Sequence, residues 1–371
     1  MSINSGLRVY VLGAGCSYDG QHGYPLANGF LSELKAYAVK IQDRKDCKQI
    51  KEAVQQTIDL LHEYRSGQYQ ASTIDQLVNL ILTDKCDDFL RRQSPASNIE
   101  GLRLGAVRNA QISTSACFLE KEGLAMDRLL PKYKAFIRRI FNENEVGTPH
   151  STSLQNSNVR VFSFNYDRLF ELAFVSARVA EEDMKVYCPY KVLNSGLYVH
   201  DTRDLEIMKD RFCFIKLHGS IGFRCIDKLG YGQKICWDGD IGRWKQVKVT
   251  DEMFFATRMP GGFRDSPLVV FPYDKKFVRD GKTSRLPNRD YIEKVWKYAE
   301  YVFPEAAELF VIGYSFSDWE DSNYLVDLIR RATNCHQIEI QNLPNECTRI
   351  SNLLKDKHQI RIPIKMNPVK F

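Results

Sequence analysis

The segment Leu7-Arg-Val-Tyr-Val-Leu-Gly-Ala-Gly-Cys-Ser17 joins a run of apolar, β-branched residues to a turn of small residues. A short apolar run that ends in glycine is typical of a buried strand in a parallel sheet. The same arrangement recurs in Phe164-Asn-Tyr-Asp167 after residues 159–163, Leu217-His-Gly-Ser220 after 212–216, and Ile312-Gly-Tyr-Ser-Phe316 after 308–312. Ligands of open parallel sheets bind beyond the carboxyl ends of the strands. We therefore expect these motifs to converge on one pocket, which favours an enzyme.

Two further runs, residues 268–271 and 337–340, resemble the other four and complete a predicted sheet of about six strands. Apolar residues recur at helical spacing in residues 50–61 and 74–82, and again in 288–303, directly before a predicted strand. The sequence thus predicts an α/β fold with a Rossmann-like parallel sheet. We expect the sheet domain to comprise residues 1–29 and 151–371, with a helical insertion over 30–150. Segments 176–211 and 224–266 are expected to form loops or a small irregular subdomain over the pocket.

The chain has 371 residues, 44% apolar content, a net charge of +6 and ten cysteines without a repeated spacing. Scattered cysteines in a long chain favour reduced thiols and a cytoplasmic location. We see no secretory signal and no apolar stretch near the roughly 20 residues that span a bilayer. Basic peaks at 128–139 and 361–370 favour a solvated surface over a nucleic-acid site, although direct nucleic-acid binding stays open.

The small residues Gly13, Ala14 and Gly15 would let backbone N–H groups approach a phosphate at the start of a helix. A dinucleotide fingerprint G-x-G-x-x-G would need glycine at position 18, where Tyr18 stands, so an ordinary dehydrogenase is disfavoured. The competing interpretation is a tight turn that binds no ligand.

Asn165 stands where a strand should give way to a helix, and its neutral amide can orient a water molecule or a ribose hydroxyl. Asp167 can accept hydrogen bonds from an amide or a sugar. Helix capping is the competing interpretation of both residues, because Asn and Asp are preferred N-cap residues. His218 follows a predicted strand, and an imidazole, with an ordinary pKa of about 6.5, suits a general base there. A structural histidine is the alternative.

Together these motifs resemble the sirtuin family, and more closely its bacterial sirtuin-like branch of NAD hydrolases that act in antiphage defence. The resemblance covers the sheet domain at both ends of the chain and says little about residues 30–150. It implies that Asn165 and Asp167 handle the water and the nicotinamide, and that His218 is the catalytic histidine. The implied cofactor contacts are Gly13, Ala14, Gly15, Ser17, Pro25, Gly313, Ser315 and Asn342.

The chain departs from protein-deacylating sirtuins, which carry a four-cysteine zinc module after the catalytic histidine. Here that region offers only Cys225 and Cys236 and no C-x-x-C pair, so we predict no bound metal. Without that module, water becomes the expected acceptor. The resemblance implies a hydrolase that converts NAD, its substrate, into nicotinamide and ADP-ribose. The alternatives are a sirtuin-type protein deacylase or ADP-ribosyltransferase, and a non-catalytic nucleotide-binding sensor.

An unregulated enzyme of this kind would drain the NAD of its own cell, which is the logic of an abortive-infection effector. The chain shows no recognisable ATPase, nuclease or sensor motif, so we expect control by assembly. We predict a homo-oligomer in which residues 30–150 supply contacts. The resemblance further implies a separate partner, a HerA-like DNA-translocating ATPase.

Overall fold

The computed structural model describes residues 6–20, 23–65, 70–95, 97–140, 158–178, 212–228, 232–237, 248–255, 264–269, 271, 289–316, 320–369 and 371. The chain divides into two compact units. The first, here called the sheet unit, comprises Met1–Gly23, Leu124–His218 and Tyr291–Phe371. The second, the helical unit, comprises Tyr24–Gly123 and Gly219–Asp290.

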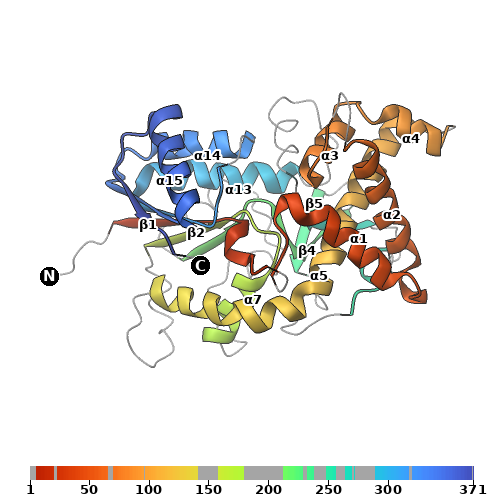
Figure 1. Ribbon diagram of the computed structural model, residues 1–371, viewed down its shortest axis with the longest axis horizontal. Coiled ribbons are helices and arrows are strands. Elements are labelled where there is room, and N and C mark those ends of the chain that lie inside the picture. Colours follow the sequence, from red (N-terminus) through yellow and green to blue (C-terminus); the bar gives the residue numbers. More distant parts are fainter. Residues whose placement is uncertain are drawn as a thin grey trace. The chain divides into compact units, whose positions relative to one another are not determined.

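A six-stranded parallel sheet forms the centre of the sheet unit, with the strand order β3-β2-β1-β7-β8-β9 (Figure 1). Its strands are β1 (Leu7–Leu12), β2 (Val159–Ser163), β3 (Cys213–Lys216), β7 (Ala306–Ile312), β8 (Gln337–Gln341) and β9 (Ile364–Asn367). All five residues of β2 and all four of β3 are buried, as expected for strands covered on both faces. The predicted α/β fold with a six-stranded parallel sheet is confirmed.

Helices cover both faces of this sheet (Figure 1). They are residues 124–140 of α5 (Ile99–Ile140) and α7 (Leu169–Arg178) on one face, and α13 (Arg289–Val302), α14 (Glu320–Arg331) and α15 (Pro344–Asn352) on the other. Tyr10 of β1 meets Phe136 of α5 with ring centroids 5.6 Å apart. Phe162 of β2 is paired with the next residue of β1 and so faces the opposite side, where Tyr298 of α13 lies 6.0 Å away.

One predicted strand belongs elsewhere, and one real strand was missed. The apolar run 268–271 was expected in the parallel sheet, but β6 (Arg264–Val269) pairs antiparallel with β4 (Gly219–Lys228), which also pairs with β5 (Gly232–Trp237). The sixth parallel strand is β9, at the sheet edge, where two of its four residues are exposed. An edge strand needs few apolar residues, so β9 gave no periodic signal and lay hidden in a basic segment.

The helical unit contains α1 (Phe30–Ile41), α2 (Lys48–Glu63), α3 (Ile74–Leu82), α4 (Asp87–Gln93) and α11 (Glu252–Phe255). The stripe that the spacing predicts on α2 is buried, including Ile50, Val54 and Leu61. Thr73 caps α3 by accepting a hydrogen bond from the Gln76 amide at 3.2 Å. The unit boundary places residues 124–140 of α5 in the sheet unit. The predicted break at Gly67 and most of segment 176–211 lie outside the described residues.

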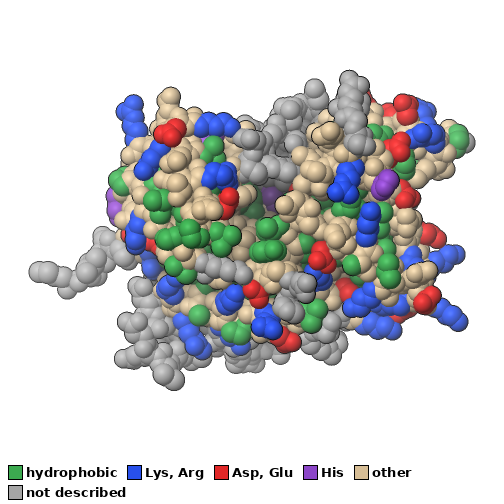
Figure 2. All heavy atoms as spheres, viewed as in Figure 1, with side chains coloured by type: hydrophobic (Ala, Val, Ile, Leu, Met, Phe, Trp, Pro, Cys, Tyr) green, Lys and Arg blue, Asp and Glu red, His purple; other side chains and the backbone are tan. Residues whose placement is uncertain are grey.

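Several cations of the two basic segments have partners inside the protein. Lys132 lies 3.9 Å from the carboxylate of Asp19, Lys365 lies 2.9 Å from that of Glu339, and Arg139 donates to Gln341 at 3.3 Å. On the face drawn in Figure 2, blue Lys and Arg side chains are interspersed with red Asp and Glu. Within the described ranges, no helix is both long and apolar enough to cross a membrane.

Candidate functional site

The carboxyl ends of five parallel strands meet at one edge of the sheet. Leu12 pairs with both Ser163 and Ile312, and Ser163 pairs with Lys216, while Ile312 pairs with Gln341. The chain leaves β1 for β2 and β3 on one side and returns through β7 and β8 on the other. The junction of β1 and β7 is therefore the topological switch point, where open α/β sheets bind ligands.

The turns after β1 and β7 interlock at this junction. Gly13 donates its N–H to the carbonyl of Ile312, and Gly15 donates to that of Gly313, each at 2.9 Å. A Cβ on Gly13 would lie 2.4 Å from Cα of Tyr314, and one on Gly313 would lie 2.5 Å from the Cys16 nitrogen. Gly313 also has φ of +62°, a conformation that side chains disfavour. These glycines are required by close backbone approach.

The loop after β1 differs from the expected phosphate cradle. It enters the short 3-10 helix η1 (Ala14–Ser17), and the first α-helix, α1, begins only at Phe30. The amides of Gly13, Gly15 and Cys16 are all used inside the protein. The expected dipole of a following α-helix is thus absent from this turn. Pro25 belongs to the helical unit, apart from the other predicted cofactor contacts.

Ser17, Tyr133 and Asn165 form a buried cluster of two hydroxyls and one amide, here called the hydroxyl–amide cluster. The Oγ of Ser17 lies 2.7 Å from the hydroxyl of Tyr133. The Asn165 Nδ2 donates to Ser17 Oγ at 3.2 Å and to the Tyr133 hydroxyl at 3.5 Å. Asn165 is 6% exposed, and its Oδ1 has no hydrogen-bond partner among the residues that the structure describes. A buried amide oxygen in that state lacks the hydrogen bond that a water molecule or a ligand would supply.

Burial sets the ionisation of two groups beside this cluster. Burial raises the pKa of Tyr133 well above its ordinary value, and the nearby Asp167 charge raises it further, so the phenol stays protonated. Burial likewise raises the pKa of the Cys16 thiol, and its Sγ lies 3.1 Å from the carbonyl of Ile312. Cys16 is thus a packed thiol and no nucleophile.

His218 follows β3 and is 6% exposed. Its ring meets Phe164 edge-on at a centroid distance of 5.1 Å and lies 5.7 Å from the ring of Tyr166. The preceding residue, Leu217, donates its amide to the carbonyl of Ser163 at 2.8 Å. That bond brings His218 beside the motif that follows β2. The imidazole therefore sits between aromatic walls at the carboxyl edge of the sheet.

Asp167 caps a helix. Its Oδ1 accepts a hydrogen bond from the amide of Leu169, the first residue of α7, at 2.9 Å. Its backbone carbonyl accepts one from Lys216, whose Nζ also lies 3.4 Å from the buried carboxylate of Glu171. Burial raises the pKa of Glu171, although Lys216 opposes that shift. Helix capping was the alternative interpretation of both Asn165 and Asp167. It describes the contact of Asp167 with α7, whereas the Asn165 side chain is directed to the hydroxyl–amide cluster.

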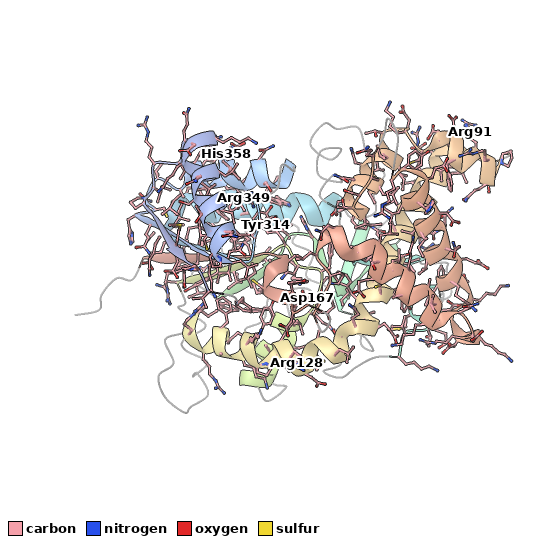
Figure 3. The ribbon with its side chains drawn as sticks, in the orientation of Figure 1. Arg91, Arg128, Asp167, Tyr314, Arg349 and His358 are labelled. Carbon is pink, nitrogen blue, oxygen red and sulfur yellow. The ribbon has the colours of Figure 1, made fainter. Side chains whose placement is uncertain are left out.

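Tyr314, Ser315 and Asn342 lie at the ends of β7 and β8. The Tyr314 ring lies 4.5 Å from that of Phe164, and its carbonyl accepts from Asn342 Nδ2 at 3.4 Å. Arg349 of α15, which the sequence did not single out, donates to the carbonyl of Ser315. Figure 3 labels Tyr314, Arg349 and Asp167 within the sheet unit.

Tyr133 is the second residue that sequence reasoning missed. It lies in a buried helical stripe with Leu129 and Phe136, so its spacing reads as ordinary core. No local signal distinguishes a core tyrosine from one whose hydroxyl enters a site.

Comparison with known proteins places the chain in a family. The model of the family described as "SIR2-like domain" matches residues 159–359, more than half of the chain. The chain therefore belongs to the SIR2-like domain family. A solved structure of a serine-to-alanine mutant of a Sir2 homologue with ADP-ribose is 14% identical, with a TM-score of 0.28, and the match covers 66% of this chain and 68% of that one. No curated protein matches the sequence.

Metal ligands do not gather in the described part of the chain. No group of three or more His, Cys, Asp or Glu side chains is placed there to hold an ion. In the antiparallel pairing of β4 with β5, Cys225 is paired with Ile235 and Cys236 with Arg224, so the two cysteines are not directly opposite.

Replacing Gly313 by Ala should destabilise the protein more than replacing Gly20 by Ala. Both glycines have positive φ, +62° and +59°, but a Cβ on Gly20 would meet nothing within 4 Å. We expect about 1–2 kcal/mol for the strained conformation in both variants. The clash with the Cys16 amide should add about 1–3 kcal/mol at Gly313. Urea denaturation measures both; equal losses would contradict the interlocked turns.

Proposed function

We propose that this protein is an NAD hydrolase that cleaves the bond between nicotinamide and ribose and releases ADP-ribose. Membership of the SIR2-like domain family supports NAD as the substrate. The observation that carries the proposal is the Asn165 amide oxygen, which is buried and without a partner in the described residues, while the Nδ2 of the same amide donates to Ser17. A ribose hydroxyl or a water molecule is the group that such an acceptor suits.

Cleavage of the bond between nicotinamide and ribose needs few catalytic groups beyond those that position the substrate and the attacking water. Oxidised nicotinamide leaves C1′ of the ribose as a neutral ring, so no general acid is needed, unlike in ordinary glycoside hydrolysis. The site has to stabilise a cationic, oxocarbenium-like carbon and present water to it. The bond from C1′ to nitrogen breaks with its electron pair going to nicotinamide, and water supplies the new bond and loses one proton.

The proposed roles are carried over from the resemblance to sirtuin-like enzymes, and the chemistry of the residues is consistent with them. Asn165 orients the water or the ribose hydroxyls, and His218 accepts the proton lost by water. The rings of Phe164 and Tyr166 flank that imidazole and present apolar surface next to it. Asp167 holds the departing carboxamide directly or through its neighbours, while its Oδ1 accepts from the first amide of α7. The proposed cofactor contacts are Gly13, Ala14, Gly15, Ser17, Pro25, Gly313, Ser315 and Asn342.

Purified protein with NAD should release equal amounts of nicotinamide and ADP-ribose, with no metal required. An acyl-lysine peptide in the same assay tests the deacylase alternative, which expects peptide-dependent nicotinamide release. A transferase would attach ADP-ribose to protein. A nucleotide sensor would bind without turnover.

We further propose a cytoplasmic abortive-infection effector that acts as a homo-oligomer, with residues 30–150 supplying contacts and a HerA-like ATPase as a separate partner. The reasoning is that an NAD hydrolase must be held inactive in an uninfected cell. Light scattering after size exclusion should show a mass above that of one chain. A monomer at micromolar concentration, unchanged by NAD or by such an ATPase, would sink this part of the proposal.

His218→Ala should lower the rate of NAD cleavage by a factor on the order of 10² or more, the effect of removing a positioned base. The control is His336→Ala, whose imidazole is 65% exposed and lies 3.7 Å from Glu308. That variant should keep full activity. Unchanged turnover in a folded His218→Ala protein would make His218 a structural residue.

Asn165→Ala should lower kcat by about 10²-fold while leaving much of the NAD affinity, because its role is to orient the reacting groups. Thr73→Ala is the matched control, since it removes a helix cap in the helical unit. It should lose about 1 kcal/mol of stability and keep its kcat. If Asn165→Ala behaved like Thr73→Ala, the proposed role of the amide would be wrong.

A further inference from the structure

The hydroxyl of Tyr133 reaches the hydroxyl–amide cluster from helix α5. The side chain is 1% exposed, and its ring packs against Phe371 and Phe170 with centroid distances of 5.0 and 6.4 Å. Those edge contacts fix the ring, so the hydroxyl is held at 2.7 Å from Ser17 Oγ. The packed ring of Tyr133 therefore holds its hydroxyl in place at the cluster.

The hydrogen bonds of the cluster decide which way the Asn165 amide faces. With Nδ2 toward the hydroxyls, the cluster contains three hydrogen bonds, two from the amide and one between Ser17 and Tyr133. If the amide were turned over, its oxygen would face the two hydroxyls. One hydroxyl proton is used between Ser17 and Tyr133, so the oxygen could accept only the other one. The two N–H groups of the amide would then be buried without an acceptor. Each buried donor without an acceptor is costly, so the observed orientation is favoured.

The protons within the cluster are ordered by the surroundings of Tyr133. The phenol is protonated and enclosed by aromatic rings, and Ser17 Oγ is the acceptor within its reach among the described residues. Ser17 then accepts from Tyr133 and from Asn165, which leaves its own proton for a ligand. Ser17 then offers one donor and Asn165 one acceptor within the same cluster, and a hydroxyl group or a water molecule can pair with both kinds of group.

We propose that Tyr133 is a positioning residue that holds the Asn165 amide with its oxygen presented to the substrate. This inference rests on the proposed NAD hydrolase. Tyr133 touches neither substrate nor reacting atoms; it acts through Ser17 and Asn165. Without its hydroxyl, Asn165 Nδ2 loses one of its two acceptors and Ser17 loses the donor that orders its proton.

Tyr133→Phe keeps the ring contacts and removes only the hydroxyl. We expect kcat for NAD cleavage to fall about tenfold, the worth of one hydrogen bond, while KM stays within about twofold. In an Asn165→Ala background the same substitution should leave the residual kcat unchanged, because the group it positions is gone. A further tenfold loss in that background would overturn the proposal, as would an unchanged kcat in Tyr133→Phe alone.

Tyr298→Phe is the matched control. Tyr298 of α13 is also 1% exposed, burial raises its pKa well above the ordinary value, and its hydroxyl bonds Cys213 and Arg160, away from the cluster. This variant should lose stability and keep both kcat and KM. If it lost kcat as Tyr133→Phe does, the effect would be general loosening of the core and the positioning role would be overturned.

A second readout separates this inference from the proposed function. Free energies of unfolding are measured for the wild type, Tyr133→Phe, Asn165→Ala and the double variant. Non-additive losses support the contact between the two side chains, and additive losses overturn it whatever the activity. Absence of NAD cleavage by the wild type would overturn the hydrolase and the role of Tyr133 in positioning Asn165 for catalysis, whereas the unfolding cycle would still report whether the cluster exists.

Discussion

The interlock of the turns after β1 and β7 is the constraint on which the rest of the site depends. Three backbone amides, from Gly13, Gly15 and Cys16, bond within this junction, and a Cβ on Gly13, Gly15 or Gly313 would lie within 3.0 Å of the facing backbone. Because the turn is pinned there, η1 closes directly after β1 and carries Ser17 into the interior, where it is 1% exposed. The same amides would have been the obvious phosphate donors. The junction therefore supplies close backbone approach, whereas the amides of Gly13, Gly15 and Cys16 are used inside the protein.

Two buried polar groupings hold the turn after β2 from different sides. Within the hydroxyl–amide cluster, Asn165 of this turn donates from its Nδ2 to Ser17. Lys216, which is ion-paired with Glu171, donates to the carbonyl of Asp167 in the same turn. Burying such an ion pair is expensive unless its remaining hydrogen bonds are satisfied, and removing one partner is costly. The carbonyl of Asp167 satisfies Lys216 and fixes the turn. Rigid support of this kind is what the role proposed for the Asn165 amide requires, since small misplacements of reacting groups lower rates steeply.

His218 and Asn165 differ in their surroundings, and the difference suits the proposed division of labour. His218 has ring neighbours, Phe164 and Tyr166, which give it apolar walls. The Asn165 Nδ2 donates to two neighbouring hydroxyls, while its Oδ1 has no hydrogen-bond partner among the described residues. The Tyr314 ring, tilted by 40° against that of Phe164, continues the aromatic surface from β2 to β7. An apolar, water-poor wall strengthens the electrostatic effect of the few polar groups that face a developing cation.

The sequence by itself determined the local elements: the buried apolar runs of β1, β2, β3, β7 and β8, the helical stripe of α2, and the order of the polar motifs that follow the strands. These are visible because burial on both faces, or on one face of a helix, imposes a periodic pattern on neighbouring residues. Pairing between distant segments leaves no such pattern. Only the tertiary structure decided that residues 264–269 join β4, that β9 completes the parallel sheet, and that Asp167 caps a helix while Asn165 does not. The same holds for Tyr133. Its sequence pattern is that of an ordinary core residue because its ring is packed in the core. Its hydroxyl meets Ser17, 116 positions away, through the packing of α5 on the sheet.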